Sequence, residues 1–118
     1  MASTHPDVIH VGELTIHRSD GLVSVDGRTL TLSIREFGLL LALADAQGRI
    51  LTREQLYREV WGKPLAGGDR SVDVYVHRLR AKLDSARPGA SFIHTHVGFG
   101  YRLSREPANG SSRSATVW

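Results

Sequence analysis

The chain has 118 residues, a mass of 13.0 kDa, 15 basic residues, 12 acidic residues and no cysteine. This length provides one domain with one hydrophobic core, so a two-domain enzyme is not expected, and the lack of cysteine excludes disulfides, cysteine-based metal sites and a thiol nucleophile. No apolar run is long enough to span a membrane and the N-terminus does not resemble a secretory signal, so the sequence predicts a soluble protein.

The first 33 residues are predicted to form short strands separated by turns. Residues 11–17, 22–25 and 28–32 are apolar or alternate polar with apolar side chains. Asp26-Gly27 between the last two runs favours a two-residue hairpin. The pattern predicts a small antiparallel sheet.

A first helix is predicted to begin after Ser33, where the apolar period changes from two to about 3.6 residues. Ser33 and Glu36 form a capping box, a frequent helix start, and Gln47-Gly48 is expected to end the helix. Its apolar face is predicted to consist of Phe37, Leu40, Leu41 and Ala44.

A second helix is predicted from the same signals, because Thr52 and Gln55 form another capping box. It is expected to end at Trp61-Gly62. Its aromatic side chains, Tyr57 and Trp61, are interpreted as packing groups and not as platforms for stacking nucleic-acid bases.

A loop and a third helix are predicted next. Residues 63–69 contain one proline and two adjacent glycines, which cannot propagate a helix. From about residue 70 to Leu83 the apolar spacing is helical again. The predicted buried stripe consists of Val72, Val76, Leu79 and Leu83.

The face of the third helix opposite this stripe bears cations and no acid. Its residues are Arg70, Val74, His77, Arg78 and Ala81. Arginine can bond guanine bidentately and an apolar group can contact a thymine methyl, so this mixture suits a DNA major groove. Arg80 and Lys82 flank the face and are expected to meet phosphates. The competing interpretation is a solvated surface helix, the usual meaning of arginines on one helix face.

The charge distribution favours the DNA interpretation. Residues 1–73 hold eight basic and ten acidic side chains, whereas residues 74–102 hold five basic and one acidic. Residues 92–103 are predicted to form a hairpin around Gly98-Phe99-Gly100. A helix–turn–helix followed by a hairpin is a layout for DNA docking.

Five segments resemble the OmpR/PhoB-type winged-helix DNA-binding domain of bacterial response regulators. In family order they are Phe37 with the following leucines, residues 51–56 (LTREQL), 60–62 (VWG), 70–83 (RSVDVYVHRLRAKL) and 98–103 (GFGYRL). The combination is far more specific than any one segment.

The resemblance implies an α+β winged helix-turn-helix fold with a four-stranded N-terminal antiparallel sheet, three helices and a C-terminal β-hairpin wing. Residues 1–10 are then an N-terminal extension and residues 11–103 the domain, while the Ser- and Gly-rich residues 104–118 are expected to be a disordered tail.

The implied function is that of a sequence-specific double-stranded DNA-binding transcription regulator, the output domain of a response regulator. The third helix would enter the major groove and the wing the neighbouring minor groove. The resemblance further implies direct-repeat DNA sites, head-to-tail pairs on DNA, no cofactor, and a place in the bacterial cytoplasm with the nucleoid.

The resemblance also assigns roles to single residues. Base-reading positions fall on Val74, His77 and Arg78, and phosphate positions on Arg70, Arg80 and Thr95. The remaining DNA-binding candidates are Ser71, Lys82, His96, Tyr101 and Arg102. The loop expected to touch RNA polymerase comprises Lys63, Pro64, Leu65, Ala66, Gly67, Gly68 and Asp69.

Two residues depart from the family pattern. Val97 stands where the wing usually has an arginine before its first glycine, and His77 stands where members often carry arginine. Affinity for DNA is therefore expected to depend on the third helix more than on the wing.

Other functions have less support. His77, His94 and His96 could in principle hold a metal, but no cysteine or nearby carboxylate is expected to complete the set. No catalytic serine elbow or phosphate-binding loop occurs in the sequence, so an enzyme is not expected. The alternative is a winged-helix module that binds a partner protein, which would need an exposed apolar patch on the third helix.

Overall fold

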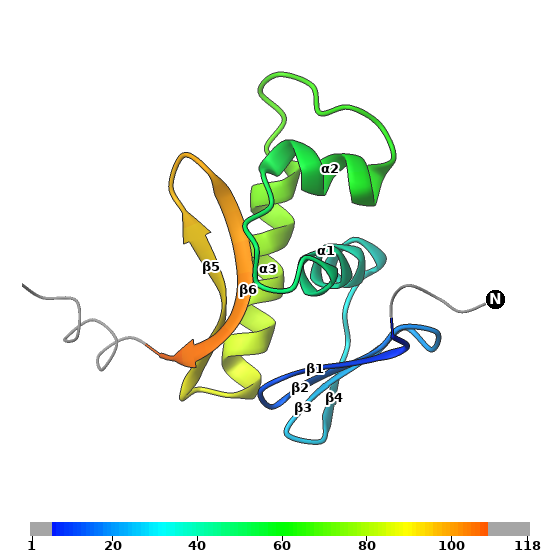
Figure 1. Ribbon diagram of the computed structural model, residues 1–118, viewed down its shortest axis with the longest axis vertical. Helices are drawn as coiled ribbons and strands as arrows, with labels where there is room; N and C mark the ends of the chain where they lie inside the picture. Colours follow the sequence, from blue (N-terminus) through cyan, green and yellow to red (C-terminus); the bar gives the residue numbers. More distant parts are fainter. Residues whose placement is uncertain (1–5, 109–118) are drawn as a thin grey trace, which may run out of the picture.

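The computed structural model describes residues 6–108, which form a four-stranded sheet, three helices and a two-stranded hairpin (Figure 1). This is the α+β winged-helix arrangement that the sequence predicts.

The N-terminal sheet has the order β1-β2-β3-β4, and all neighbouring strands are antiparallel. The strands are β1 (Val8–Val11), β2 (Leu14–His17), β3 (Leu22–Val25) and β4 (Arg28–Leu30). Asp26 and Gly27 both have positive φ angles, 53° and 79°, as the hairpin signal between β3 and β4 requires. The predicted boundary at residue 11 differs from the structure, because β1 begins at Val8 and pairs with β2 across a turn at Gly12.

Capping boxes start the first two helices, as predicted. In α1 (Ile34–Asp45), the Ser33 hydroxyl accepts the Glu36 N–H at 3.2 Å and the Glu36 carboxylate accepts the Ser33 N–H at 2.8 Å. In α2 (Arg53–Trp61), Thr52 and Gln55 make the equivalent pair of bonds. The caps satisfy backbone N–H groups that have no partner inside a helix.

The buried face of α1 is rotated from the predicted one. Leu39, Leu40 and Leu43 are fully buried, whereas Phe37 and Leu41 are only half-buried. The difference arises because Phe37 and Leu41 line a groove between α1 and α2 that remains accessible to solvent.

The third helix and the hairpin are both longer than predicted. α3 (Ser71–Ala86) buries the stripe Val72, Val76, Leu79 and Leu83, as expected. Strands β5 (Ala90–His96) and β6 (Gly100–Pro107) extend the hairpin, with Ala90 opposite Pro107. Part of the segment expected as a disordered tail is therefore ordered strand, and residues 109–118 lie outside the described residues.

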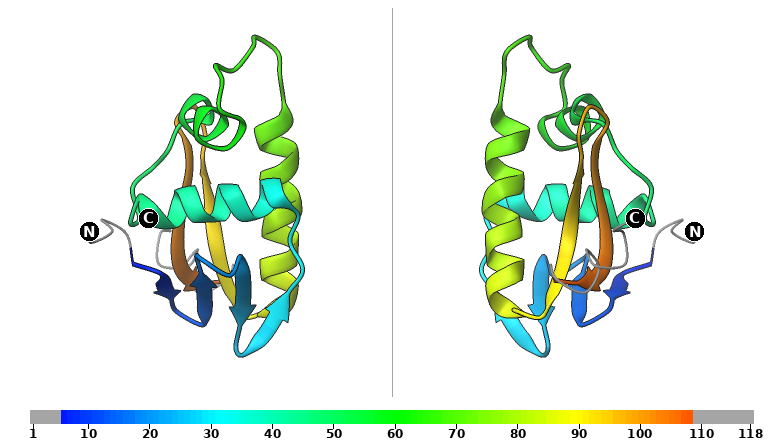
Figure 2. Two further views of the ribbon diagram at one scale, coloured as in Figure 1. Left: turned by 90° about the vertical axis from the view of Figure 1, so that its right-hand side faces the viewer. Right: turned by 90° about the vertical axis from the view of Figure 1, so that its left-hand side faces the viewer.

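The elements form one core. α3 runs along the hairpin from the level of α2 toward the N-terminal sheet, and α1 crosses α3 (Figure 2). The sheet contributes Leu14, Ile16, Val23 and Val25 to the core, and the hairpin contributes Phe92, Ile93 and Leu103. This packing fixes which face of α3 remains free.

Candidate nucleic-acid interface

The face of α3 opposite the buried stripe is exposed to solvent. All five residues predicted there are exposed: Arg70, Val74, His77, Arg78 and Ala81. Over residues 71–86 the acids are Asp73 and Asp84, and both are half-buried. Burial raises the pKa of Asp84 above its usual range, and Asp73 is paired with cations. The exposed surface of the helix is therefore cationic.

An aromatic stack holds Arg78 in place. Its guanidinium lies 5.3 Å from the centre of the Tyr75 ring, and Tyr75 contacts Trp61 edge-on. Trp61 in turn stacks on the buried Tyr57, with ring centres 4.6 Å apart. Tyr57 and Trp61 are thus packing groups, as predicted, and the stack limits the conformations of Arg78 while leaving it exposed.

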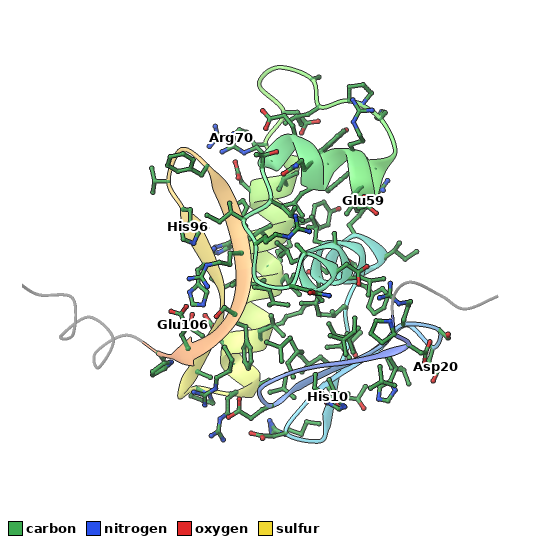
Figure 3. All side chains as sticks on the ribbon, in the orientation of Figure 1. His10, Asp20, Glu59, Arg70, His96 and Glu106 are labelled. Carbon is green, nitrogen blue, oxygen red and sulfur yellow. The ribbon has the colours of Figure 1, made fainter. Side chains whose placement is uncertain are left out.

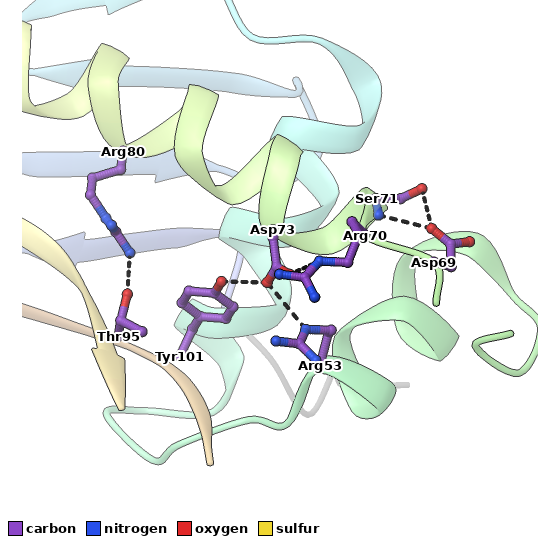
Figure 4. A network of polar contacts seen from close by, with 8 residues as sticks. All are labelled: Arg53, Asp69, Arg70, Ser71, Asp73, Arg80, Thr95 and Tyr101. Carbon is purple, nitrogen blue, oxygen red and sulfur yellow. Dashed lines mark hydrogen bonds and ion pairs between the residues drawn. The ribbon is translucent and has the colours of Figure 1, made fainter. Parts of the chain in front are cut away.

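A polar network centres on Asp73, near the start of α3 (Figure 4). Asp73 Oδ1 accepts bonds from the Tyr101 hydroxyl at 2.6 Å and from Arg53 Nε at 3.1 Å, and Oδ2 lies 3.2 Å from Arg70 Nε. Burial favours a higher pKa for Asp73, but Tyr101 and the arginines outweigh it and the pKa is lowered. Asp73 is therefore an ion-pair partner of two arginines.

Tyr101 supports α3 from inside the molecule. The side chain is buried, and burial together with the Asp73 carboxylate raises the pKa of Tyr101 to about 12. Its backbone also forms an isolated β-bridge with Leu51, through N–H···O bonds of 2.8 and 2.9 Å. The Tyr101 side chain is thus buried with its hydroxyl bonded to Asp73, and its contact with DNA stays a prediction.

Arg53 is a cation beside this site that was not among the predicted site residues. It is the first residue of α2, and its side chain is 43% exposed. Arg53 belongs to the LTREQL segment that carries part of the resemblance, and that segment is the signal by which it could have been found.

Asp69 and Ser71 shape the start of α3. The Asp69 carboxylate accepts the Ser71 N–H at 2.8 Å and the Ser71 hydroxyl at 2.6 Å. These two bonds are the main reason why the pKa of Asp69 is lowered, and further polar neighbours contribute. The hydroxyl proton of Ser71 is therefore already used within the protein.

Arg80 and Thr95 are brought together from α3 and β5. Arg80 Nη2 donates to the Thr95 hydroxyl at 2.7 Å (Figure 4). Both were predicted as phosphate positions, and the bond between them joins the third helix to the wing.

The Lys82 side chain is bonded to residues at the start of α1 and just before it. Its Nζ donates to Glu36 Oε1 at 2.7 Å and to the Thr31 carbonyl at 2.9 Å. Glu36 is only 2% exposed, and although burial favours a higher pKa, Lys82 and Ser33 lower the pKa of Glu36 overall. Lys82 thus neutralises a buried carboxylate, and its contact with a phosphate stays a prediction.

The outer side of the hairpin carries a mixed-charge cluster. Arg102 donates from Nε to His96 Nε2 at 3.0 Å and from Nη2 to Glu106 Oε2 at 3.0 Å. His94 Nε2 lies 3.7 Å from the same Glu106 oxygen. His96 and Glu106 are on the side of the hairpin away from α1 (Figure 3). Because Glu106 offsets the charge of Arg102, the hairpin is less positive than α3.

Glu106 corrects the expectation that no carboxylate lies near these histidines, because its Oε2 is 3.7 Å from His94 Nε2. Across residues 6–108, no group of three or more potential metal ligands gathers. The described helices include none that is long and apolar enough to cross a membrane.

The tip of the hairpin is apolar. Val97 is 88% exposed and Phe99 is 72% exposed, on either side of Gly98. Gly100 has a φ of 146°, and a Cβ there would lie 2.0 Å from the Leu51 carbonyl oxygen, so only glycine fits.

The loop between α2 and α3 is mostly exposed. In residues 63–69, Leu65 and Asp69 are half-buried and the others are exposed. Leu65 packs against the core and anchors the loop. The backbone around it is accessible to a partner.

A helix–turn–helix whose second helix is basic and exposed, followed by a β-hairpin, defines the winged-helix class of DNA-binding domains. The family model described as "Transcriptional regulatory protein, C terminal" matches residues 27–103. The chain belongs to this family of OmpR/PhoB-type DNA-binding output domains.

Curated relatives are response regulators and regulatory proteins of bacteria. The chain is 38% identical over 96 residues to the sensory transduction protein RegX3 of Mycobacterium tuberculosis, covering 81% of this chain and 42% of that protein. It is 41% identical over 97 residues to the transcriptional regulatory protein AfsQ1 of Streptomyces coelicolor, covering 82% and 43%. The chain thus spans less than half the length of these relatives.

Solved structures share the fold. The DNA-binding domain of CpxR from E. coli superposes with a TM-score of 0.75 at 35% identity, covering 85% of this chain and 97% of that one. The DNA-binding domain of RstA from Klebsiella pneumoniae, in complex with the RstA box, gives 0.75 at 34% identity, covering 84% and 98%.

Proposed function

We propose that this domain regulates transcription with α3 in the major groove of a specific DNA site and the β5–β6 hairpin at the adjacent minor groove. The observation that carries this proposal is the exposed cationic face of α3, whose half-buried acids do not offset it. Phosphates contribute most of the affinity of such surfaces, and base edges contribute the specificity. The domain would act by binding and not by catalysis.

The roles of the side chains follow from their positions. Val74, His77 and Arg78 would read base edges, because all three are exposed on the face of α3 opposite the buried stripe. The phosphate contacts would come from the cations Arg53, Arg70 and Arg80, together with Thr95 and the outer part of Ser71. Arg102 and His96 would lie near the minor-groove backbone.

The assembly on DNA is also part of the proposal. We infer that two copies bind direct repeats head to tail, and that residues 63–69 contact RNA polymerase, because this loop is exposed and anchored by Leu65. The natural setting would be the bacterial cytoplasm, at the nucleoid. A partner protein as the main ligand of α3 is disfavoured, since Val74 is the one large exposed apolar residue on residues 71–86.

Selection of bound duplexes from random oligonucleotides, followed by fluorescence anisotropy across salt concentrations, tests the proposal. With about four cations on phosphates, log K should fall against log[salt] with a slope near −3.6. No sequence preference together with no salt dependence would contradict DNA binding.

Two arginine variants test the division of roles. Arg78→Ala should cost about 1–3 kcal/mol of binding and relax one base preference, whereas Arg80→Ala should weaken all sequences alike. Arg58→Ala, an exposed arginine on α2, is the matched control and should leave the affinity unchanged. Equal effects of the first two variants on every sequence would contradict the assignment.

A further inference from the structure

Val97 and Phe99 form an exposed apolar tip of the wing, at the end of the molecule where α2 and α3 begin (Figure 1). They are 88% and 72% exposed, on a turn closed by the Phe99 N–H to the His96 carbonyl at 2.8 Å. Neighbouring large apolar side chains that are exposed together mark interaction sites more often than single ones do.

The tip is held in a fixed position relative to α3. Thr95 and Tyr101 are cross-strand partners two residues from the tip on either side. Thr95 accepts a hydrogen bond from Arg80, and Tyr101 donates one to Asp73. The helix α3 is therefore hydrogen-bonded to both strands at one cross-strand pair. The Leu51–Tyr101 bridge adds a second support from the connection before α2. Any partner that α3 meets is therefore also presented to the tip.

The charges around the tip indicate what kind of partner this is. Arg53 lines a hollow of about 290 Å³ between the start of α2 and the wing turn, together with the acidic Glu54. Arg70, 72% exposed, lies at the same end of the molecule (Figure 3), and Asp73 pairs with both Arg53 and Arg70. Residues 95–100 contain no acid. An apolar point bordered by cations matches a polyanion that has an apolar interior, and DNA bases stacked between phosphates are such a partner.

We propose that Phe99, assisted by Val97, acts as an apolar wedge that inserts from the minor groove between two base pairs and bends the DNA. This inference rests on the proposed function, since it requires α3 to be bound in the neighbouring major groove. Aromatic and aliphatic wedges unstack a base step and kink the duplex, and flexible pyrimidine–purine steps unstack most easily. The wing thus selects a deformable step without hydrogen bonds to bases.

The test uses the duplex that the wild-type chain selects from random oligonucleotides. One version carries a donor and an acceptor dye at its two ends and reports bending. Another carries 2-aminopurine at successive steps beside the major-groove site and reports unstacking by increased fluorescence. The wild type should bend the duplex and brighten one step.

Phe99→Ala should lose the 2-aminopurine signal and most of the bend, and should bind about tenfold more weakly. Phe99→Leu is the matched control, because leucine keeps an apolar wedge and should retain most of both signals. Val97→Arg should bind with a steeper salt slope, by about 0.9, as one phosphate contact is added. Both positions are exposed, and circular dichroism of each variant verifies folding.

The outcomes separate the two proposals. A wild-type chain that selects no duplex contradicts DNA binding and the wedge with it. A wild-type chain that selects a duplex, with Phe99→Ala matching it in affinity, bend and fluorescence, overturns the wedge alone. If Phe99→Ala changes the sedimentation of the DNA-free chain and leaves the bend intact, the tip binds a second copy, which also overturns the wedge.

Discussion

The outward face of α3 and the tip of the wing lie at one end of the molecule but differ in chemistry. The helix exposes Arg70, His77 and Arg78, whereas the tip exposes Val97 and Phe99. The first surface depends on charge and therefore weakens with salt, while the second depends on apolar contact and shape. Hydrogen bonds from α3 to both wing strands connect the two surfaces.

Gly100→Ala is expected to have the largest effect, because it separates the two surfaces. Its Cβ would overlap the Leu51 carbonyl and break the bridge between Leu51 and Tyr101. Strained backbone and two lost buried hydrogen bonds should lower the free energy of unfolding by about 3–5 kcal/mol, measured by urea denaturation. Gly98→Ala, with open space at its Cβ, should cost about 1–2 kcal/mol. Equal losses of unfolding free energy for the two variants would contradict the role of the Leu51–Tyr101 bridge in holding the wing.

Asp73→Ala should have the next largest effect, since it removes hydrogen bonds that connect α3 to the wing and to α2. Removing one carboxylate leaves the buried Tyr101 hydroxyl without its acceptor and Arg53 without its partner. We expect a loss of about 2–3 kcal/mol of unfolding free energy. Asp73→Asn keeps an acceptor for Tyr101 and should lose about half as much. If Asp73→Ala and Asp73→Asn have the wild-type free energy of unfolding, the Asp73 network does not connect α3 to the wing.

Salt dependence should distinguish the two surfaces on DNA. The double variant Arg70→Gln/Arg80→Gln should reduce the magnitude of the salt slope by about 1.8, because two phosphate contacts are lost. The double variant Val97→Ala/Phe99→Ala should weaken binding at every salt concentration with the slope unchanged. Anisotropy titrations at several salt concentrations measure the affinity and the salt slope of both double variants. A change of slope in Val97→Ala/Phe99→Ala would contradict the assignment of the wing tip to apolar contact.

The smallest expected effect concerns the far end of the wing, where Glu13 pairs with Arg105 through two bonds of 2.8 and 3.0 Å and lies 3.3 Å from Arg87. The pKa of Glu13 is lowered from 4.5 to about 2, mainly by the hydrogen bond from Arg105. A carboxyl group with a lowered pKa in the folded state stabilises the fold above its unfolded pKa and loses this contribution as pH falls.

The unfolding free energy should therefore decline between pH 4.5 and about 2. Glu13→Gln should make this decline shallower while leaving the affinity of α3 for DNA at neutral pH unchanged. Urea denaturation at a series of pH values measures the first quantity. An identical pH profile for Glu13→Gln and the wild type would exclude Glu13 as a contributor.

The parts of the fold that could be predicted are those encoded by neighbouring residues. Ser33 with Glu36 and Thr52 with Gln55 start their helices through contacts three residues apart, and Asp26-Gly27 determines its own turn. The rotation of the α1 face was not predictable from periodicity, because it depends on where α2 lies beside α1 and on the groove that leaves Phe37 half-buried.

The candidate site was predictable where it depends on helical geometry and not where it depends on distant partners. The exposed residues of α3 followed from the 3.6-residue period. The pairing of Lys82 with Glu36 joins positions 46 residues apart, and that of Tyr101 with Asp73 joins positions 28 apart. Nothing local in the sequence distinguishes such a lysine or tyrosine from one that meets a phosphate.

The Leu51–Tyr101 bridge has a consequence for amide hydrogen exchange. Both amides are hydrogen-bonded between a loop and a strand, and their partners are fixed by the same core that holds β6. The Leu51 amide lies between two helices, in a segment that would otherwise exchange rapidly, yet it can exchange only when the wing detaches. Its protection factor thus reports the opening free energy of the wing directly, in the absence of any ligand.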